Sequence, residues 1–457
     1  MAKLVGLDIG TSGCKALLID EHGSVLKQAH AEYPLSTPRP GWSEQNPEDW
    51  WQGVQACMAE IDEKPDAIGL SGQMHGSVFL NDRNEVIRPA LLWNDQRTAP
   101  ECEEIYDRVG RDRVHAITCN PPLTGFQLPK LLWLRNHEPH NYERVRSLLL
   151  PKDYIRFKLT GHKLTEPSDA AGTGILDVPS RSWSEPMMAA LDLDALIFPE
   201  IRESWELFDG VAGGGGDQAA GAVGTGAVVP GVISVSLGTS GVVFVAKEEP
   251  IADPTGATHT FCHANGKWHQ MGVMLSCGGA LRWYRDTFAP GMTYDELSGE
   301  ASTAPPGAEG LTFLPYLAGE RCPHNDPSLR ASFQGATLAH SRAHFTRAVF
   351  EGVTFGILDC LYALLPNPTG ELRLTGGGAK GAFWSQMIAD ATQMPCVTLE
   401  ADEGPAYGAA LLAGVGLGIW SSVEEACAQT VRIKRRIEPR AVDYTEAYRR
   451  YREVSRR

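Results

Sequence analysis

Short apolar runs separated by glycine-containing turns open the chain and predict strands. Residues 4–8 are apolar and end in a carboxylate, residues 14–20 alternate in polarity, and residues 24–33 form a third run after a turn at 21–23. Runs of this length with turns between them are typical of an antiparallel meander. We therefore expect three consecutive strands at the start of the chain.

A helix is predicted after this meander. Asn46 suits the N-cap, Pro47 suits the first helical position, and apolar residues follow at helical spacing up to Ile61. Further patterns of both kinds continue along the chain. They predict strands at 67–70, 89–93, 232–235, 242–246, 259–262, 267–271 and 371–375, and helices over 98–108, 128–136, 341–365, 383–393 and 444–457. The alternation indicates a mixed α/β protein.

One segment recurs about half the chain later. Residues 7–13 read Leu-Asp-Ile-Gly-Thr-Ser-Gly, and residues 235–241 read Val-Ser-Leu-Gly-Thr-Ser-Gly. Each copy lies between two strand-like runs and begins a mixed α/β half of similar length. Recurrence in matching context indicates two related domains, which we predict to be residues 1–229 and 230–457.

Composition narrows the class of protein. The chain has 457 residues, of which 43% are hydrophobic and 21% charged, so it can bury large cores and is not expected to be disordered. Its net charge of −15 argues against nucleic acid or an acidic membrane surface as a partner. Two long uncharged stretches, 218–246 and 405–423, are broken by glycines, so we expect ligand-facing strands and helices there and no membrane span.

The cysteines and histidines do not indicate a metal site. The ten cysteines form no Cys-x-x-Cys pair, and scattered thiols are typical of buried small residues in a reducing compartment. His259 and His263, like His340 and His344, lie four residues apart without an acidic partner, so zinc is not expected. Residues 1–8 lead directly into a strand without a signal-peptide pattern, which favours a cytoplasmic protein.

The repeated Gly-Thr-Ser-Gly turns suit phosphate binding. Small residues allow backbone N–H groups to approach phosphate oxygens, and the hydroxyl groups of the turns add donors. Ordinary hairpin turns are the alternative for either copy alone, but the repeat favours two loops that face each other across a cleft. Only the first copy carries an acid, Asp8, where the second has Ser236. One carboxylate beside a polyphosphate suits Mg²⁺, bound directly or through water.

A second glycine-rich segment contains a candidate general base. Asp217 follows four glycines, precedes an Ala/Gly helix and is the sole charged residue from Val211 to Ala246. A plain helix N-cap is the alternative reading. The isolation of the carboxylate favours a base for a hydroxyl proton.

Two weaker motifs complete the candidate site. Residues 376–378 are three glycines at the end of a predicted strand, where backbone can lie close to a nucleotide. Residues 71–76 also follow a strand and include His75, which could bind a sugar hydroxyl. A structural histidine is the alternative for that residue.

Together, these motifs resemble the FGGY carbohydrate kinases within the actin/sugar-kinase superfamily. The match extends over nearly the whole chain in the correct order. Its segments are residues 6–12, 71–76, 93–95, 150–154, 168–173, 214–217, 236–241, 319–321 and 376–378.

The resemblance implies a fold and an activity. The expected fold is α/β, with two related actin/sugar-kinase-like (ribonuclease H-like) domains around a central cleft. The expected reaction is transfer of the ATP γ-phosphoryl group, with Mg²⁺, to a ketose, namely D-xylulose in xylose catabolism. The family also implies a homodimer. The implied ATP-binding residues are Gly10, Thr11, Ser12, Gly238, Thr239, Ser240, Gly377 and Gly378.

The resemblance also implies roles around the sugar. Asp217 is expected to be the base, Asp8 the acid on the Mg·ATP side, and Met74, His75, Asp217 and Gln218 the residues that surround the sugar. Gln218 departs from the asparagine common after this aspartate, which bears on the preference among ketoses. Alternatives are an FGGY kinase for another ketose or polyol, an ATP-driven conformational protein of the same superfold, and a sugar-binding regulator.

Overall fold

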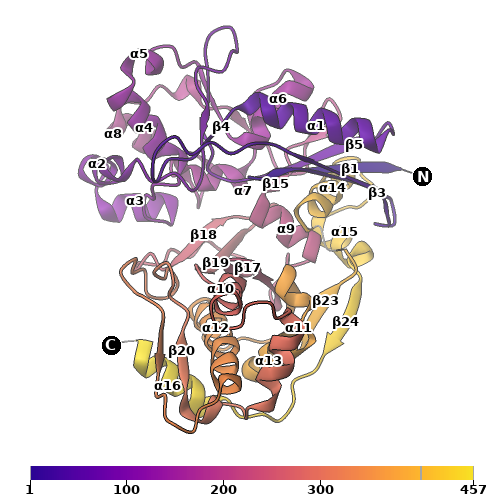
Figure 1. Ribbon diagram of the computed structural model, residues 1–457. Coiled ribbons are helices and arrows are strands. Elements are labelled where there is room, and N and C mark those ends of the chain that lie inside the picture. Colours follow the sequence, from indigo (N-terminus) through magenta and orange to yellow (C-terminus); the bar gives the residue numbers. More distant parts are fainter. Residues whose placement is uncertain (1, 402–403, 456–457) are drawn as a thin grey trace.

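A computed structural model describes residues 2–401 and 404–455, which form two lobes (Figure 1). The first lobe contains a mixed sheet in the order β13-β14-β5-β1-β2-β3, with β15 beside β5. Its strands are β1 (Lys3–Ile9), β2 (Gly13–Asp20), β3 (Val25–Glu32), β5 (Ala67–Gly72), β13 (Leu207–Phe208), β14 (Val211–Ala212) and β15 (Gly215–Gly216). The predicted meander is confirmed as β1–β3.

The second lobe contains the corresponding sheet, in the order β18-β19-β17-β16-β22-β23-β24. Its strands are β16 (Val232–Leu237), β17 (Gly241–Lys247), β18 (Thr258–Cys262), β19 (Trp268–Met274), β22 (Glu371–Thr375), β23 (Cys396–Leu399) and β24 (Ile433–Ile437). In both sheets the first strand pairs antiparallel with the second and parallel with a later one, β5 or β22. The sequence repeat is therefore a repeat of topology.

Helices and short strands surround these sheets. The helices are α1 (Pro47–Ile61), α2 (Ala99–Val109), α3 (Arg111–Thr118), α4 (Gln127–His137), α5 (Pro139–Tyr142), α6 (Pro151–Thr160), α7 (Pro167–Ala170), α8 (Glu185–Leu191), α9 (Asp217–Thr225), α10 (Gly278–Phe288), α11 (Tyr294–Thr303), α12 (Arg342–Leu364), α13 (Ala382–Thr392), α14 (Gly404–Gly416), α15 (Val423–Thr430) and α16 (Thr445–Ser455). The short strands are β4 (Glu44–Gln45), β6 (Val78–Leu80), β7 (Ala90–Leu91), β8 (Ser147–Leu149), β9 (Leu164–Thr165), β10 (Leu176–Asp177), β11 (Ser182–Trp183), β12 (Glu200–Ile201), β20 (Thr312–Leu314) and β21 (Ser332–Gln334).

Most predicted elements occur within a few residues of their expected bounds. Asn46 caps α1 as expected, since its side chain accepts the N–H of Glu48. The strand predicted at 89–93 is much shorter, because β7 forms only a two-residue ladder with β4 and a single bridge from Leu91 to Ser77. The last predicted helix is α16, and its expected final residues, 456–457, lie outside the described part of the chain.

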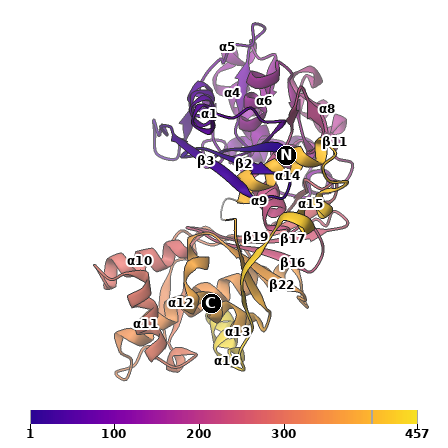
Figure 2. The ribbon, with the colours of Figure 1, turned by 90° about the vertical axis from the view of Figure 1, so that its right-hand side faces the viewer.

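The chain returns to the first lobe after completing most of the second. Helix α14 packs against α9 and against β1 and β5 of the first sheet, and Figures 1 and 2 show it beside that sheet. The approach is close: a Cβ at Gly6 would lie 1.8 Å from the carbonyl oxygen of Ala406, and one at Gly69 would lie 1.8 Å from that of Ala409. The uncharged stretch 405–423 thus supplies a buried helix that packs against the first sheet. The division of the chain into two domains at residues 229/230 stays a prediction.

The ten cysteines are buried and none forms a disulfide, as their scattered spacing predicts. Within the described ranges, no helix is long and apolar enough to cross a membrane.

Candidate active site

The central strand β5 brings the two candidate acids into one site. Asp8 of β1 pairs with Ser71 of β5, and on the other side of β5 Gly215 pairs with the same Ser71. Asp217 comes directly after β15 and begins α9. Glycine is required just before this point, because Gly214 has φ +69° and a Cβ there would lie 1.5 Å from the Leu70 carbonyl oxygen.

The electrostatics of Asp217 suit a general base. Burial is the main cause that raises its pKa to about 7, and the nearby charge of Asp8 acts in the same direction. Gln218 opposes the shift, since its Nε2 donates a hydrogen bond to Asp217 Oδ1 at 3.3 Å. A carboxylate with a pKa near neutrality can take a proton from a hydroxyl group and later release it.

The first Gly-Thr-Ser-Gly turn joins β1 to β2 beside Asp8. Its Gly10 N–H donates to the Gly13 carbonyl oxygen at 3.1 Å, which closes the turn. Side chains from other elements then hold it. Four hydrogen bonds do so: Tyr33 Oη to the Gly10 carbonyl at 2.6 Å, Gln45 Nε2 to the Thr11 carbonyl at 2.7 Å, Trp93 Nε1 to Thr11 Oγ1 at 3.0 Å, and Thr11 Oγ1 to Gln73 Oε1 at 3.2 Å. Ser12, at the tip, is exposed.

The second turn joins β16 to β17 and faces the start of α10. The N–H of Gly278 donates to the Gly238 carbonyl at 2.8 Å, and the N–H of Gly279 donates to the Thr239 carbonyl at 3.0 Å. Arg282, one helical turn further on, donates to Thr239 Oγ1 at 3.2 Å. The first N–H groups of α10 are thus used within the protein, and the exposed turn and the Arg282 guanidinium beside it are what suits phosphate oxygens.

The second turn and the third glycine cluster line one cavity of about 620 Å³. Gly238 and Thr239 lie on one side of it, and Gly377 and Gly378 lie on another, after β22. Apolar and aromatic walls complete the cavity: Leu237, Leu281, Tyr294, Phe350 and Trp384. The structure thus brings together four residues that the motifs place more than a hundred positions apart, whereas Ser240 does not line this cavity.

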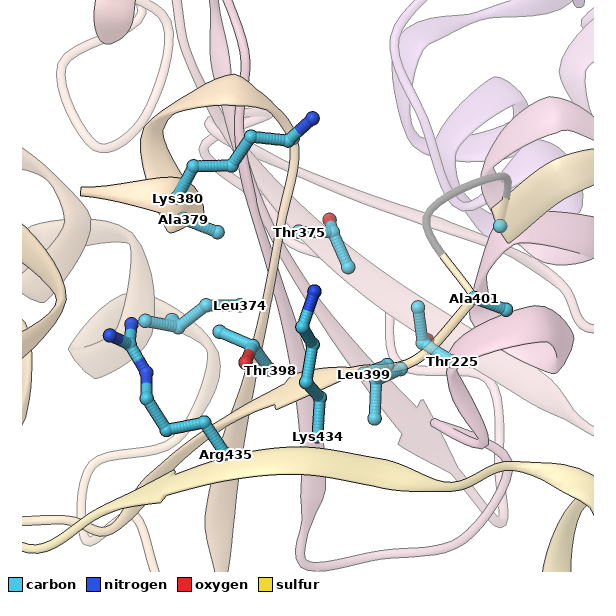
Figure 3. A pocket seen from close by; sticks show the side chains of 12 residues that line it. Thr225, Leu374, Thr375, Ala379, Lys380, Thr398, Leu399, Ala401, Lys434 and Arg435 are labelled. Carbon is cyan, nitrogen blue, oxygen red and sulfur yellow. The ribbon is translucent and has the colours of Figure 1, made fainter. Parts of the chain in front are cut away.

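A separate cavity of about 430 Å³ lies on the other side of the same glycine cluster (Figure 3). Thr375 and Lys380 contribute to it from β22 and the turn that follows, and Lys434 and Arg435 contribute from β24. Of the residues predicted from the sequence to lie close to the nucleotide, Gly376 lines this second cavity, whereas Gly377 and Gly378 line the first.

Met74 and His75 follow β5, and Met74 lies against Gly216, the residue before Asp217. A Cβ at Gly216 would meet Met74 Cγ at 2.8 Å, so the Met74 side chain packs directly against the residue before the base. The His75 ring stacks on Phe126 with centroids 4.6 Å apart, and its Nδ1 lies 2.6 Å from the Gly172 carbonyl oxygen.

The charge state of His75 follows from this setting. Burial lowers its pKa to about 3, and the positive charges of Lys130 and Arg321 act in the same direction. The ring is therefore neutral at physiological pH. Because a carbonyl oxygen can only accept, Nδ1 carries the proton, and Nε2 is left as an acceptor for a ligand hydroxyl.

Two further side chains hold the backbone around His75, and none of the sequence motifs indicates them. Lys130 is fully buried in α4, and its Nζ donates to the carbonyl oxygens of His75 at 2.8 Å and Gly125 at 2.6 Å. Gln127 Nε2 donates to the Gly76 carbonyl at 2.9 Å. In the sequence Lys130 is an isolated charge within an apolar run, as Asp217 is within an uncharged segment, so the same criterion could have identified it.

The expected magnesium ion would have Asp8 as its protein carboxylate and would be held mainly by the nucleotide. In the described ranges, no group of three or more His, Cys, Asp or Glu residues could form a complete protein metal site. Mg²⁺ binds through one or two carboxylates, with substrate phosphates and waters as its other ligands. The charge of Asp8 raises the pKa of Asp217, so the two carboxylates act on each other electrostatically.

Comparison with known proteins agrees with this geometry. Residues 3–239 match the N-terminal domain of the FGGY family of carbohydrate kinases, and residues 233–417 match its C-terminal domain. The chain belongs to the FGGY family of carbohydrate kinases. Its fold is accordingly that of a two-domain α/β sugar kinase, as expected from the sequence, and ATP is the phosphate donor of this family.

Individual relatives are similar over almost their full length. The xylulose kinase of Lactococcus lactis subsp. lactis is 41% identical over 93% of this chain and 90% of that protein. The crystal structure of a xyloylose kinase from Brucella ovis has a TM-score of 0.93 at 40% identity, covering 99% of this chain and 98% of that one. That of a gluconate kinase from Lactobacillus acidophilus has a TM-score of 0.94 at 27% identity, covering 100% and 98%.

Proposed function

We propose that this FGGY kinase transfers the γ-phosphoryl group of ATP to the terminal hydroxyl of D-xylulose, giving D-xylulose 5-phosphate and ADP. The observation that carries the proposal is Asp217, a largely buried carboxylate with a pKa of about 7 that lies next to Asp8 and Met74. A base at this point lies between the turn that follows Asp8 and the segment that carries Met74 and His75. The relatives with about 40% identity are named xylulose or xyloylose kinases, which supports D-xylulose as the sugar.

In the proposed reaction, Asp217 accepts the proton of the attacking hydroxyl. The sugar oxygen then bonds to the γ-phosphorus while the bond to the β–γ bridging oxygen breaks, and ADP leaves with that electron pair. Phosphoryl transfer depends chiefly on positioning and on neutralising charge. Helix α9 and the pairing of β15 with β5 fix Asp217 in place for this task.

On the nucleotide side, we assign Gly10, Thr11 and Ser12 to one phosphate turn and Gly238, Thr239 and Ser240 to the other. The cavity of about 620 Å³ would hold the adenosine against Gly377 and Gly378, because its walls are apolar and aromatic. Asp8 would hold Mg²⁺, directly or through water. When bound, the ion supplies positive charge to the phosphate oxygens.

On the sugar side, Met74 would form an apolar wall, and His75 Nε2 would accept a hydrogen bond from a sugar hydroxyl. Gln218 would add an amide beside Asp217. The presence of both proposed acids, Asp8 and Asp217, supports a kinase over a sugar-binding regulator. We also propose that the protein is cytoplasmic, where ATP is available, takes part in xylose catabolism and forms a homodimer.

A coupled assay of ADP release tests the proposal. D-xylulose should give by far the highest kcat/KM in a panel with D-ribulose, xylitol, glycerol and D-gluconate. Gluconate as the best substrate would contradict the choice of sugar and agree instead with the similarity to the Lactobacillus acidophilus gluconate kinase. ATP turnover that is equally fast without any sugar would favour a conformational ATPase.

A further inference from the structure

The motif Gly319-Glu320-Arg321 lies in the second lobe, between β20 and β21, and has no role in the reaction described above. Glu320 fastens this segment to the end of β19. Its buried carboxylate accepts the N–H of Leu275 at 2.9 Å and the N–H of Arg321 at 2.8 Å. Both bonds are to backbone groups, so Glu320 fixes the course of the chain at Arg321.

In the described part of the chain, no carboxylate lies at ion-pair distance from the guanidinium of Arg321. The guanidinium is largely buried, and burial lowers its pKa, although the charge of the neighbouring Glu320 acts to raise it. Within the described ranges it forms no ion pair, and its nearest polar side-chain contact is His259 of β18, with Nη1 3.5 Å from Nε2. Arginine is always charged and only donates hydrogen bonds. Such a group, only partly exposed, can donate to a ligand oxygen that takes the place of water.

His259 accepts only part of what Arg321 can donate. Asn120 Nδ2 donates to the Thr118 and Thr260 carbonyls, so Asn120 Oδ1 is the atom 3.1 Å from His259 Nδ1. That oxygen accepts, Nδ1 therefore carries the proton, and Nε2 offers one lone pair to Arg321. Burial lowers the pKa of His259 to about 3, so the ring stays neutral. The remaining N–H groups of Arg321 are left for another acceptor.

Arg321 belongs to the wall that the second lobe presents to His75. The ring of Phe261, two residues after His259 on β18, lies 6.2 Å from those of His75 and Phe126 and stacks on His259 at 5.9 Å. The positive charge of Arg321 lowers the pKa of both His75 and His259. By contrast, the charge that most affects Asp217 is that of Asp8. Arg321 is thus associated with the His75 side of the pocket, and the reacting end with the two acids.

We propose that Arg321 donates hydrogen bonds to the carbonyl-bearing end of the ketose, opposite the hydroxyl that is phosphorylated. A carbonyl oxygen only accepts, so it matches a side chain that only donates, whereas a hydroxyl there would bring a proton of its own. Arg321 would therefore favour a ketose over the corresponding alditol, and the sugar would connect the two lobes. This inference rests on the proposed function.

Binding measurements on two ligands test the assignment. Isothermal calorimetry would compare D-xylulose with xylitol, in which a hydroxyl replaces the C2 carbonyl, for the wild type and for Arg321→Gln. We expect the variant to bind D-xylulose 10- to 100-fold more weakly and xylitol less than 3-fold more weakly, with unchanged ATP affinity. Arg321→Lys, which keeps the charge without the fork, should recover part of the preference for the ketose.

A matched control removes a charge from the same loop. Arg330 is exposed and donates only to the Pro327 and Leu329 carbonyls, so Arg330→Gln should leave both dissociation constants unchanged. The assignment would be overturned if Arg321→Gln weakened the binding of D-xylulose and xylitol by the same factor, so that the ratio of the two dissociation constants stayed at its wild-type value. If Arg321→Gln does not fold, a wild-type ratio in Arg321→Lys would overturn it as well. Turnover of D-xylulose by the wild type distinguishes the two possible failures. If the wild type phosphorylates D-xylulose, only the assignment of Arg321 is overturned; if it does not, the proposed function and the assignment are both overturned.

Discussion

Replacing Asp217 by Asn should remove turnover and, at neutral and alkaline pH, make the protein more stable. Burial and the charge of Asp8 raise the pKa of Asp217 from 3.8 to about 7. Each pKa unit corresponds to about 1.4 kcal/mol, so ionised Asp217 costs the folded state up to about 4 kcal/mol above pH 7. Asn carries no charge and can keep the hydrogen bond from Gln218 through its Oδ1.

The sign of the pH dependence follows from proton binding. Between pH 3.8 and about 7, the folded protein binds more protons at Asp217 than the unfolded chain does, so the contribution of this residue to the free energy of unfolding falls as pH rises. Asn contributes no such decline. The difference in stability between variant and wild type should therefore be near zero at pH 4 and largest at pH 8.

Urea unfolding at pH 4, 6 and 8 would measure this difference, and coupled ADP release would measure turnover. A positioned base contributes roughly 10²- to 10⁴-fold, so kcat should fall by that factor. Asp82→Asn is a suitable control, because Asp82 is an exposed carboxylate in the same lobe and its loss should change neither quantity at any pH. A stability difference that does not vary with pH would refute the electrostatic reasoning, and near-normal turnover in a folded variant would refute the assignment of the base.

Three further substitutions test other parts of the site. Asp8→Ala should lower kcat severely across a Mg²⁺ titration while calorimetry still detects sugar binding; lost sugar affinity with a normal Mg²⁺ response would place Asp8 on the wrong side. His75→Ala should reduce kcat/KM for D-xylulose by about 1–3 kcal/mol without changing the KM for ATP, and less for a deoxy analogue that lacks the bound hydroxyl; an unchanged ratio between the two sugars would make His75 structural. Lys130→Met leaves two buried carbonyls unpaired, so urea unfolding should show a loss of about 1–3 kcal/mol, with a raised KM for the sugar; no change in either would show that water replaces the lysine.

Several features of the fold could be predicted because their signals are local. The strands and turn around residues 10–13 follow from apolar runs with glycines between them. Helix α1 follows from Asn46 and Pro47, whose effects involve only neighbouring backbone groups. Topological duplication could be predicted as well, since both copies of the turn keep the same residues in the same context.

By contrast, Asp8 and Asp217 come into one site only in the folded chain. More than two hundred residues separate them, and β5 joins them by pairing with β1 on one side and β15 on the other. The raised pKa of Asp217 depends on this arrangement and on burial. A motif can therefore identify a candidate base, but its proton affinity is a property of the surrounding packing.

The sequence by itself determined the fold class, and it contains the two Gly-Thr-Ser-Gly turns and the two acids that we propose for phosphate binding and catalysis. These follow from residue types and short-range spacing, which act through local backbone geometry. Tertiary structure alone decided that Lys130 supports the backbone at His75, that α14 returns to the first sheet, and that Arg321 lies beside His259. Such contacts join segments far apart in the chain, and no local pattern encodes them, because they arise only when both sheets have formed and packed.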